Sequence, residues 1–280
     1  MPQSRSSRNV SRRDLLKGLA AGGIGAATGA LFHGYRYERF HVGVTREVLD
    51  VSGLPEALSG LRIGLITDLH RSDTVSHEMI DRAVRLLMSE APDLVILGGD
   101  YVTWGDRRFV GPAADALAPL TAPHGVFGIL GNHDNDHDMP PALSAKGFVV
   151  LRDARTRLTI RGETLDLAGV RYWTRKPSEV AYVLRGAAPN VILLAHTPMR
   201  LIEAAALAVP LVLSGHTHGG QIVLPGIGAV AAREFPVIAG AGRRDNTRIF
   251  VSRGVGTVYV PVRLNCPPEV AVLTLRPVER

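Results

Sequence analysis

The sequence is poor in cysteine and in aromatic residues. Among its 280 residues Cys266 is the single cysteine, which excludes an intramolecular disulfide and a cysteine-based zinc cluster. Aromatic residues make up 5% of the chain, and no basic run with interleaved aromatics follows the N-terminal segment. We therefore expect no dedicated nucleic-acid binding. Any metal site must be built from histidine and carboxylate side chains.

The chain also lacks a strong excess of charge outside its N-terminus. Residues 1–30 carry a net +4 of the total +6, which leaves only +2 for the rest. The charged residues of this segment are Arg5, Arg8, Arg12, Arg13, Lys17 and Asp14. The small remainder argues against the basic groove of a nuclease. A hydrophobic fraction of 46% is typical of a globular protein with a sizeable core.

The N-terminal segment has the anatomy of an export signal. The stretch SRRDLLK, residues 11–17, precedes an apolar, glycine- and alanine-rich run over 18–32. Paired arginines before a mildly hydrophobic run are typical of a twin-arginine signal. The alternatives are a buried helix or a membrane span, for which the run is short and rich in glycine.

We interpret residues 1–35 as a twin-arginine signal that is either removed or kept as a membrane tether, because no clear Ala-x-Ala cleavage site follows it. This interpretation predicts the twin-arginine export machinery as a partner. It also predicts a periplasmic, cell-envelope or extracellular location, with possible membrane association through the N-terminus.

The rest of the chain, residues 40–280, is expected to form one α/β domain. Apolar runs bounded by polar or turn residues predict strands, and apolar spacing of three and four predicts helices. The expected strands cover 41–50, 61–68, 92–100, 125–134, 190–198 and 210–220, with antiparallel strands in 148–172 and three more strands in 247–275. The expected helices cover 76–90, 109–120, 139–146 and 177–187.

Polar residues recur where five of the apolar strands end. They are Asp68 and His70, then Asp100, then Asn132, His133 and Asp134, then His196, and finally His216 and His218. The carboxyl ends of strands in α/β sheets are where ligands bind. Carboxylate, imidazole and amide donors together suit manganese, iron, zinc or cobalt better than calcium.

The order of these blocks resembles the calcineurin-like metallophosphoesterases. The sequence reads Asp-x-His, Gly-Asp, Gly-Asn-His-Asp, His and Gly-His-x-His, in that order, across residues 68–218. The leader, GHTHGGQIVLP and the late NCPPEVAVLTL further resemble an exported bacterial phosphodiesterase branch of the family. The resemblance implies an α/β fold, a four-layer α/β/β/α sandwich of two facing mixed sheets flanked by helices.

The resemblance also implies a role for each block. Asp68, His70 and His218 would bind a first metal ion, Asn132, His196 and His216 a second, and Asp100 would bridge the two. His133 would contact the phosphate and protonate the leaving group, with Asp134 orienting it. Two divalent or trivalent ions about 3.5–4 Å apart can clamp a phosphate and activate water. The implied reaction is hydrolysis of a phosphate mono- or diester, with the diester favoured.

Several alternatives stay open at this point. A non-catalytic metal- or envelope-binding protein on the same scaffold, or a nuclease, would share these blocks, and the substrate could be of lipid, nucleotide or cell-wall type. Purple acid phosphatases have a tyrosine three positions after the Gly-Asp aspartate, where this chain has Thr103, so we expect no tyrosinate-ligated iron. Tyr172 and Trp173 are expected to pack rather than to stack on a substrate.

Overall fold

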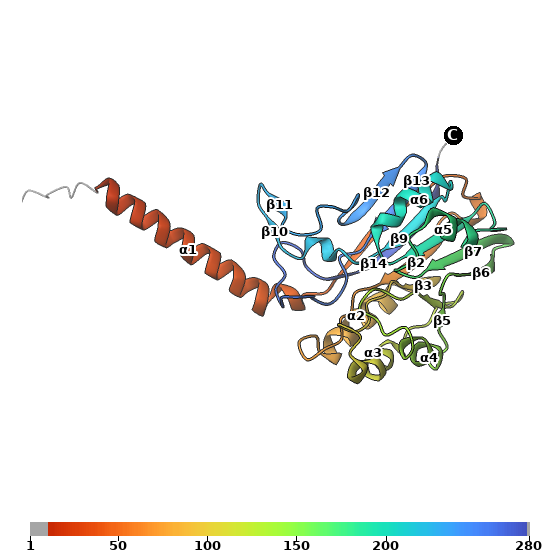
Figure 1. Ribbon diagram of the computed structural model, residues 1–280, viewed down its shortest axis with the longest axis horizontal. Helices are drawn as coiled ribbons and strands as arrows, with labels where there is room; N and C mark the ends of the chain where they lie inside the picture. The colour runs from red at the N-terminus through yellow and green to blue at the C-terminus, as the bar shows by residue number, and fades with distance from the viewer. Residues whose placement is uncertain (1–10, 279–280) are drawn as a thin grey trace, which may run out of the picture.

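The computed structural model describes residues 11–278, and two six-stranded mixed sheets face each other at its centre (Figure 1). The first sheet consists, in spatial order, of β1 (Gly43–Val51), β14 (Glu269–Pro277), β2 (Arg62–Ile66), β3 (Leu94–Leu97), β4 (Val126–Gly128) and β5 (Val149–Val150). The second consists of β12 (Gly240–Arg244), β13 (Thr247–Val251), β9 (Leu211–Ser214), β8 (Val191–Ala195), β7 (Glu163–Val170) and β6 (Ala154–Ile160). Most neighbouring strands are parallel, and the antiparallel pairs are β14–β2, β12–β13 and β6–β7.

Helices cover the outer faces of both sheets. The helices α2 (His77–Ser89), α3 (Val110–Leu117) and α4 (Met139–Ser144) share one apolar cluster with the first sheet. The helices α5 (Pro177–Val183) and α6 (Leu201–Ala206) share another with the second sheet. The remaining elements are the hairpin β10 (Val223–Leu224) and β11 (Gly228–Ala229) and the short 3-10 helices η1 (Glu38–Phe40), η2 (Glu56–Leu58), η3 (Arg107–Phe109), η4 (Pro198–Arg200) and η5 (His218–Gly220).

The alternation of side chains along each strand explains why the apolar runs are unbroken. In β3, Leu94 and Ile96 pack between the two sheets, while Val95 and Leu97 pack under the helices. Both faces of the strand are therefore buried, as in parallel sheets covered by helices. The four-layer α/β/β/α fold implied by the sequence is confirmed.

One part of the expected strand pattern is wrong. Within the described residues, the stretch 247–275 contains β13 and β14 but no third named strand, and the additional strand β12 precedes it. Residues 253–268 contain several glycines and prolines, which weaken or interrupt a strand. This stretch instead forms a loop that runs past the ends of the strands.

The helix α1 (Arg12–Arg36) extends away from the domain (Figure 1). The Ser11 side chain accepts a hydrogen bond from the Asp14 N–H and caps its N-terminus. The segment Arg12–Phe40 is long and apolar enough to cross a membrane, with a hydropathy of 1.4, although a signal sequence meets the same criterion. The apolar run over 18–32 is thus part of a longer helical segment than its own length suggests. The first ten residues of the leader lie outside the described residues.

The C-terminal end of α1 is fixed to the domain. Gly34 is buried, and its carbonyl oxygen accepts the Arg263 N–H at 3.3 Å. Just beyond the helix, the Glu38 carboxylate accepts the backbone N–H groups of Asn265 and Cys266 at 3.0 and 2.6 Å. The loop that follows β13 is thus tied directly to the segment that leaves the helix.

Candidate metal centre

The five sequence blocks converge at the carboxyl ends of strands from both sheets. The first three blocks follow β2, β3 and β4 of the first sheet, and the last two follow β8 and β9 of the second. The potential metal ligands form two sets of three residues. Within each set, the three ligand atoms lie within 4.8 Å of one another. One set consists of Asp68, His70 and His218, and the other of Asp100, His196 and His216. Because the sheets face each other, residues more than a hundred positions apart meet in one site.

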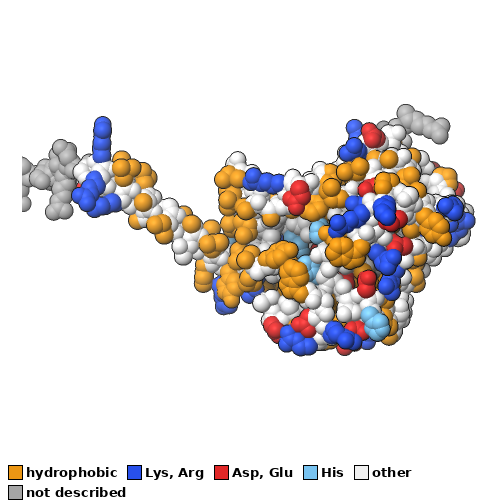
Figure 2. Space-filling view, viewed as in Figure 1, with side chains coloured by type: hydrophobic (Ala, Val, Ile, Leu, Met, Phe, Trp, Pro, Cys, Tyr) orange, Lys and Arg blue, Asp and Glu red, His pale blue; other side chains and the backbone are white. Residues whose placement is uncertain are grey.

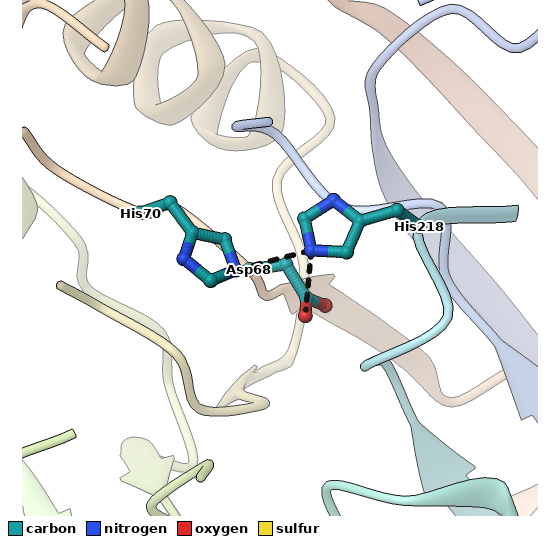
Figure 3. Close-up of side chains that lie close together, drawn as sticks. All are labelled: Asp68, His70 and His218. Atoms are coloured by element: carbon teal, nitrogen blue, oxygen red, sulfur yellow. Dashed lines mark hydrogen bonds and ion pairs between the residues drawn. The ribbon is translucent and has the colours of Figure 1, made fainter. Parts of the chain in front are cut away.

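The first cluster joins Asp68 to two imidazoles (Figure 3). The Nε2 atom of His218 lies 3.5 Å from Asp68 Oδ1 and 3.0 Å from Nε2 of His70. Ligands bonded at about 2.0–2.1 Å to one ion stand about 3 Å apart, so this spacing suits two imidazoles on one cation. The neighbouring carboxylate adds the negative charge that a cation needs.

The second cluster contains lone pairs with no partner. Nδ1 of His196 donates to the Gly98 carbonyl at 2.8 Å, so the neutral ring has its lone pair on Nε2. That Nε2 lies 3.1 Å from Asp100 Oδ2, yet it makes no aligned hydrogen bond to any residue in 11–278. The side-chain oxygen of Asn132 is also buried without a partner in the same range. Unpaired buried acceptors facing a carboxylate need a cation or a proton.

Asp100 lies between the two clusters. Its Oδ2 atom is 3.5 Å from Nε2 of His70 and 3.1 Å from Nε2 of His196, so it faces one imidazole from each set. Its Oδ1 atom accepts the His133 backbone N–H at 2.8 Å, which fixes the orientation of the carboxylate. This is the placement that a bridging carboxylate requires.

Burial controls the charge of the histidines. It lowers the pKa of His70 to about 4 and that of His216 to about 3, so both rings are neutral and can bind metal. Burial also disfavours the charged form of His196, but the neighbouring Asp100 and Asp68 carboxylates raise its pKa to about 10. The protein therefore binds a positive charge between these groups, whether a proton or a metal ion.

The chain turns sharply where it presents these ligands. Five of them have left-handed φ angles, namely Asp68 (53°), His70 (48°), Asp100 (55°), His216 (74°) and His218 (50°). Such conformations cost residues with a Cβ about 1–2 kcal/mol each. Strain at several ligands within one site is typical of functional positions, where the surrounding fold holds the residues in place.

Asp134 holds two of the ligand loops together. Its Oδ2 accepts the N–H groups of Asp100 and Gly131, both at 2.8 Å, and its Oδ1 accepts that of Tyr101 at 2.7 Å. Asp134 is expected to orient or tune His133, and its hydrogen bonds in the described chain all come from backbone N–H groups rather than from the His133 ring. Backbone N–H groups that follow β3 and β4 donate to the carboxylate instead. Asp134 therefore influences the site by holding these two loops together.

His133 is held with its ring neutral. Burial lowers its pKa, although Asp100 opposes this. Its Nδ1 accepts the Trp104 backbone N–H at 3.2 Å, so the neutral ring has its proton on Nε2. The ring also lines the cleft that contains the ligands. His133 can therefore offer an Nε2–H donor to a bound phosphate.

The site opens into a cleft of about 370 Å³. Figure 2 shows histidine side chains in a hollow, with hydrophobic side chains beside it. The apolar lining residues are Ile222, Val230, Ala231, Ala232, Phe235, Val258, Tyr259 and Val260. Tyr172 lies 5.3 Å from the His216 ring, and Trp173 is 63% exposed. The expectation that both would pack was therefore wrong for Trp173.

Tyr101 and Thr103 have different environments. The Tyr101 side chain is buried, and its hydroxyl donates to the Ile129 carbonyl at 2.9 Å. The Thr103 hydroxyl lies 3.3 Å from Nδ1 of His70, on the side of the ring away from the cluster. Tyr101 therefore contributes to the packing below the site, and Thr103 contacts one of the candidate ligands.

Arg263, which no sequence pattern had singled out, is fully buried behind the first cluster. Its guanidinium donates to backbone carbonyls of the surrounding loop, those of Arg253, Gly254, Gly256 and Cys266. Burial lowers the pKa of Arg263 to about 10, so the group is still charged near neutral pH. It lies 3.4 Å from Nδ1 of His218. Burial, His70 and this positive charge together lower the pKa of His218 well below its usual value.

This chain belongs to the calcineurin-like phosphoesterase family, whose sequence model matches residues 61–220. It is 31% identical to the uncharacterized metallophosphoesterase YkuE of Bacillus subtilis, over 96% of this chain and 99% of that protein. It is 32% identical to the phosphodiesterase YaeI of Escherichia coli, over 76% and 82% respectively. A cattle transmembrane protein with a metallophosphoesterase domain is 28% identical, over 83% of this chain and 57% of its own length. The protein is thus a phosphoester hydrolase, and its two clusters suggest divalent metal ions.

Proposed function

We propose that this protein is a binuclear-metal phosphodiesterase of the cell envelope, in which His133 acts as the general acid. The observation that supports this most strongly is the position of Asp100 Oδ2, which faces one imidazole nitrogen from each cluster, at 3.5 and 3.1 Å. A carboxylate in that position can bridge two cations and keep them close. The unpartnered lone pairs of His196 and Asn132 in the described chain support two ions rather than one.

In this proposal the ligands divide as the family resemblance implies. Asp68, His70 and His218 would hold one ion, and His196 and His216 the other, with Asp100 shared between the two sets. The buried side-chain oxygen of Asn132, which has no partner in the described chain, would complete the second set. The mixture of carboxylate, imidazole and amide donors suits manganese, iron, zinc or cobalt. When bound, such a pair of ions polarises the phosphate and activates water for in-line attack.

The chain's own groups supply the remaining steps. Neutral imidazoles keep the site cationic, so it attracts a phosphate anion. The charge of a bound phosphate anion favours the protonated form of the His133 ring, and its Nε2–H can then pass a proton to the leaving oxygen as the P–O bond breaks. Asp134 keeps His133 in place by joining the loops beyond β3 and β4.

The proposed location follows from α1. The twin arginines Arg12 and Arg13 begin a helix that is long and apolar enough to cross a membrane, and basic residues favour the cytoplasmic side. This orientation would put the domain on the outer side, where a twin-arginine signal would deliver it. The named cattle relative is a transmembrane protein, and the named E. coli relative a phosphodiesterase, which supports a membrane-tethered diesterase.

The test is hydrolysis by protein stripped with a chelator and reloaded with Mn²⁺. We expect turnover of bis(p-nitrophenyl) phosphate to exceed that of p-nitrophenyl phosphate. The metal content, measured by mass spectrometry, should approach two ions per chain. Protein that holds two ions but turns over neither ester would refute the proposal, and rapid cleavage of DNA would favour a nuclease instead.

A further inference from the structure

The mouth of the cleft has an exposed apolar border. We name this border the rim: Ile222, Val230, Tyr259 and Val260 line the cleft, Trp104 contacts Tyr259, and Ile227 lies in the turn between β10 and β11. Tyr259 is 79% exposed and Ile227 64%, although both are large apolar side chains. The ring of Trp104 lies 5.6 Å from that of Tyr259 and 4.3 Å from that of His133, so the rim reaches the catalytic histidine. A group of exposed apolar residues around a binding site marks a surface for another apolar body.

The same loop that forms part of the rim also contacts α1. Val258, Tyr259 and Val260 line the cleft, and a Cβ placed on Gly34 would come within 2.9 Å of the Val262 side chain. The loop that ends at Asn265 also binds the β10–β11 hairpin, because the Val223 N–H donates to the Leu264 carbonyl at 2.8 Å. The loop that carries Tyr259 and Val260 is therefore attached to the C-terminal end of α1, and the β10–β11 hairpin is attached to it through that loop.

The length of α1 determines the depth at which its C-terminal end would lie in a bilayer. From Arg12 to Gly34 the helix rises about 33 Å, close to the thickness of about 30 Å of a hydrocarbon core. Phe32, Tyr35 and Tyr37 are exposed around its C-terminal end, and aromatic side chains are typical of the membrane–water interface. With α1 spanning the membrane, the loop that contacts Gly34 lies at the outer interface.

The position of the hairpin agrees with this placement. The β10–β11 hairpin lies on the side of the domain from which α1 emerges (Figure 1), and hydrophobic side chains gather there (Figure 2). The helices α5 and α6 lie toward the other end of the domain (Figure 1). With α1 in a membrane, the rim would therefore face the bilayer, and α5 and α6 would lie away from it.

We propose that the rim docks on the outer surface of the membrane that α1 spans, and that the substrate is a membrane lipid with a phosphodiester headgroup. The inference rests on the proposed hydrolytic function and narrows its substrate class. Docking brings the cleft to the depth at which lipid phosphates lie, and the apolar rim contacts the adjoining acyl region. Hydrolysis consumes one water, breaks one P–O bond, and yields an alcohol and a phosphomonoester. His133 gives its proton to the alcohol and recovers one from the attacking water.

The first test compares two isoleucines in the full-length, metal-loaded protein. Ile227→Asp places a charge on the rim, and Ile202→Asp is the matched control, on α6 and 40% exposed. The substrates are phosphatidylglycerol in phosphatidylcholine vesicles, with products identified by mass spectrometry, and soluble bis(p-nitrophenyl) phosphate. Ile227→Asp should lower the vesicle rate at least about fivefold and change the soluble rate less than about twofold.

The outcomes separate the two proposals. Ile202→Asp should leave both rates within about twofold of the unmodified protein. Unmodified protein that cleaves the soluble diester but not the vesicle lipid overturns the lipid inference alone, whereas inactivity on both substrates overturns the hydrolytic function. An equal effect of Ile227→Asp on both substrates also overturns the membrane-docking role of the rim.

A second test detects docking without catalysis. The single native cysteine, Cys266, is only 2% exposed, so Ile227→Cys or Ile202→Cys provides the reactive thiol for a polarity-sensitive dye. In phosphatidylglycerol–phosphatidylcholine vesicles, the dye at position 227 should show a blue-shifted emission, and that at 202 an emission typical of water. Water-like emission at both positions would overturn the proposal.

Discussion

Gly215 and Asp68 are in such close contact that a Cβ on the glycine would lie 2.2 Å from Asp68 Oδ2. The next residue in the chain, His216, donates its backbone N–H to both oxygens of the same carboxylate, at 3.0 and 3.1 Å. One glycine therefore lets the strand end β9 approach the strand end β2. This contact brings a ligand from each sheet into a single site.

The substitution Gly215→Ala should displace Asp68 and weaken the first cluster. A displacement of about 1 Å at a reacting centre can cost on the order of 100-fold in rate. We therefore expect a comparable loss of diesterase rate and less than the full metal content, measured by mass spectrometry after dialysis. Gly111→Ala on α3 is the control, because an added Cβ there meets no atom within 4 Å. Normal metal content and rate in Gly215→Ala would contradict the assignment.

Removing the His133 ring should separate chemistry from metal binding. In the variant His133→Ala, both clusters retain their ligands, so the metal content should stay the same. The rate on a diester with an alkyl leaving group should fall about 10²–10⁴-fold, the usual contribution of a general acid. The fall should be much smaller for p-nitrophenol, which leaves without a proton. Loss of metal from this variant would show that the ring binds or positions an ion.

Asp134→Asn should weaken the joint between the loops beyond β3 and β4. An amide nitrogen in place of one carboxylate oxygen faces backbone N–H donors, so at least one hydrogen bond is lost. We expect the free energy of unfolding to fall by about 1–3 kcal/mol in urea denaturation. Asp136→Asn, at an exposed position of the next loop, should leave it unchanged. A changed pH profile of the rate without loss of stability would instead indicate direct action on His133.

The buried Asp166 should give the protein an acid-sensitive component of stability. Burial raises the pKa of this carboxyl, but bonds from Arg157, the Ala188 N–H and Arg155 outweigh it and keep the pKa below its ordinary value. The stabilisation is therefore complete above the unfolded pKa of about 4 and is lost as pH falls through the lower folded value.

Urea denaturation between pH 7 and pH 3 checks this prediction. Asp166→Asn should lower the free energy of unfolding by about 2 kcal/mol at pH 7 and flatten its decline in acid. The exposed Asp245→Asn serves as the control and should follow the unmodified protein at every pH. An Asp166→Asn curve parallel to that of the unmodified protein would contradict the assigned role.

The strand ends were predictable because they depend on local patterns. Apolar runs such as 92–97, followed by Gly-Gly-Asp, mark both the strand and the point at which the chain leaves it. The positions of the ligand blocks at the strand ends can therefore be predicted from the sequence alone. The position of Asp100 near imidazoles of both clusters follows from two sheets whose carboxyl ends meet.

The supporting contacts were not predictable, because they join positions distant in sequence. The carbonyl groups that accept hydrogen bonds from Arg263 are brought around it by the fold of the loop, which no local sequence pattern reveals. Asp134 was assigned to its sequence neighbour His133, whereas its strongest bonds reach backbone groups of Asp100 and Gly131. Three strands were expected within 247–275, but the stretch between β13 and β14 is a loop, whose path depends on α1 and on the hairpin that it contacts.

The place of β14 has a consequence for how the chain is made. This last strand, Glu269–Pro277, inserts between β1 and β2, and its pairing with β1 extends over the full length of both strands. The first sheet can close only after Glu269–Pro277 has been synthesised. Until then, β1 lacks its neighbour and the interior of the sandwich stays accessible to chaperones. A chain truncated before position 269 would therefore be unable to complete its first sheet.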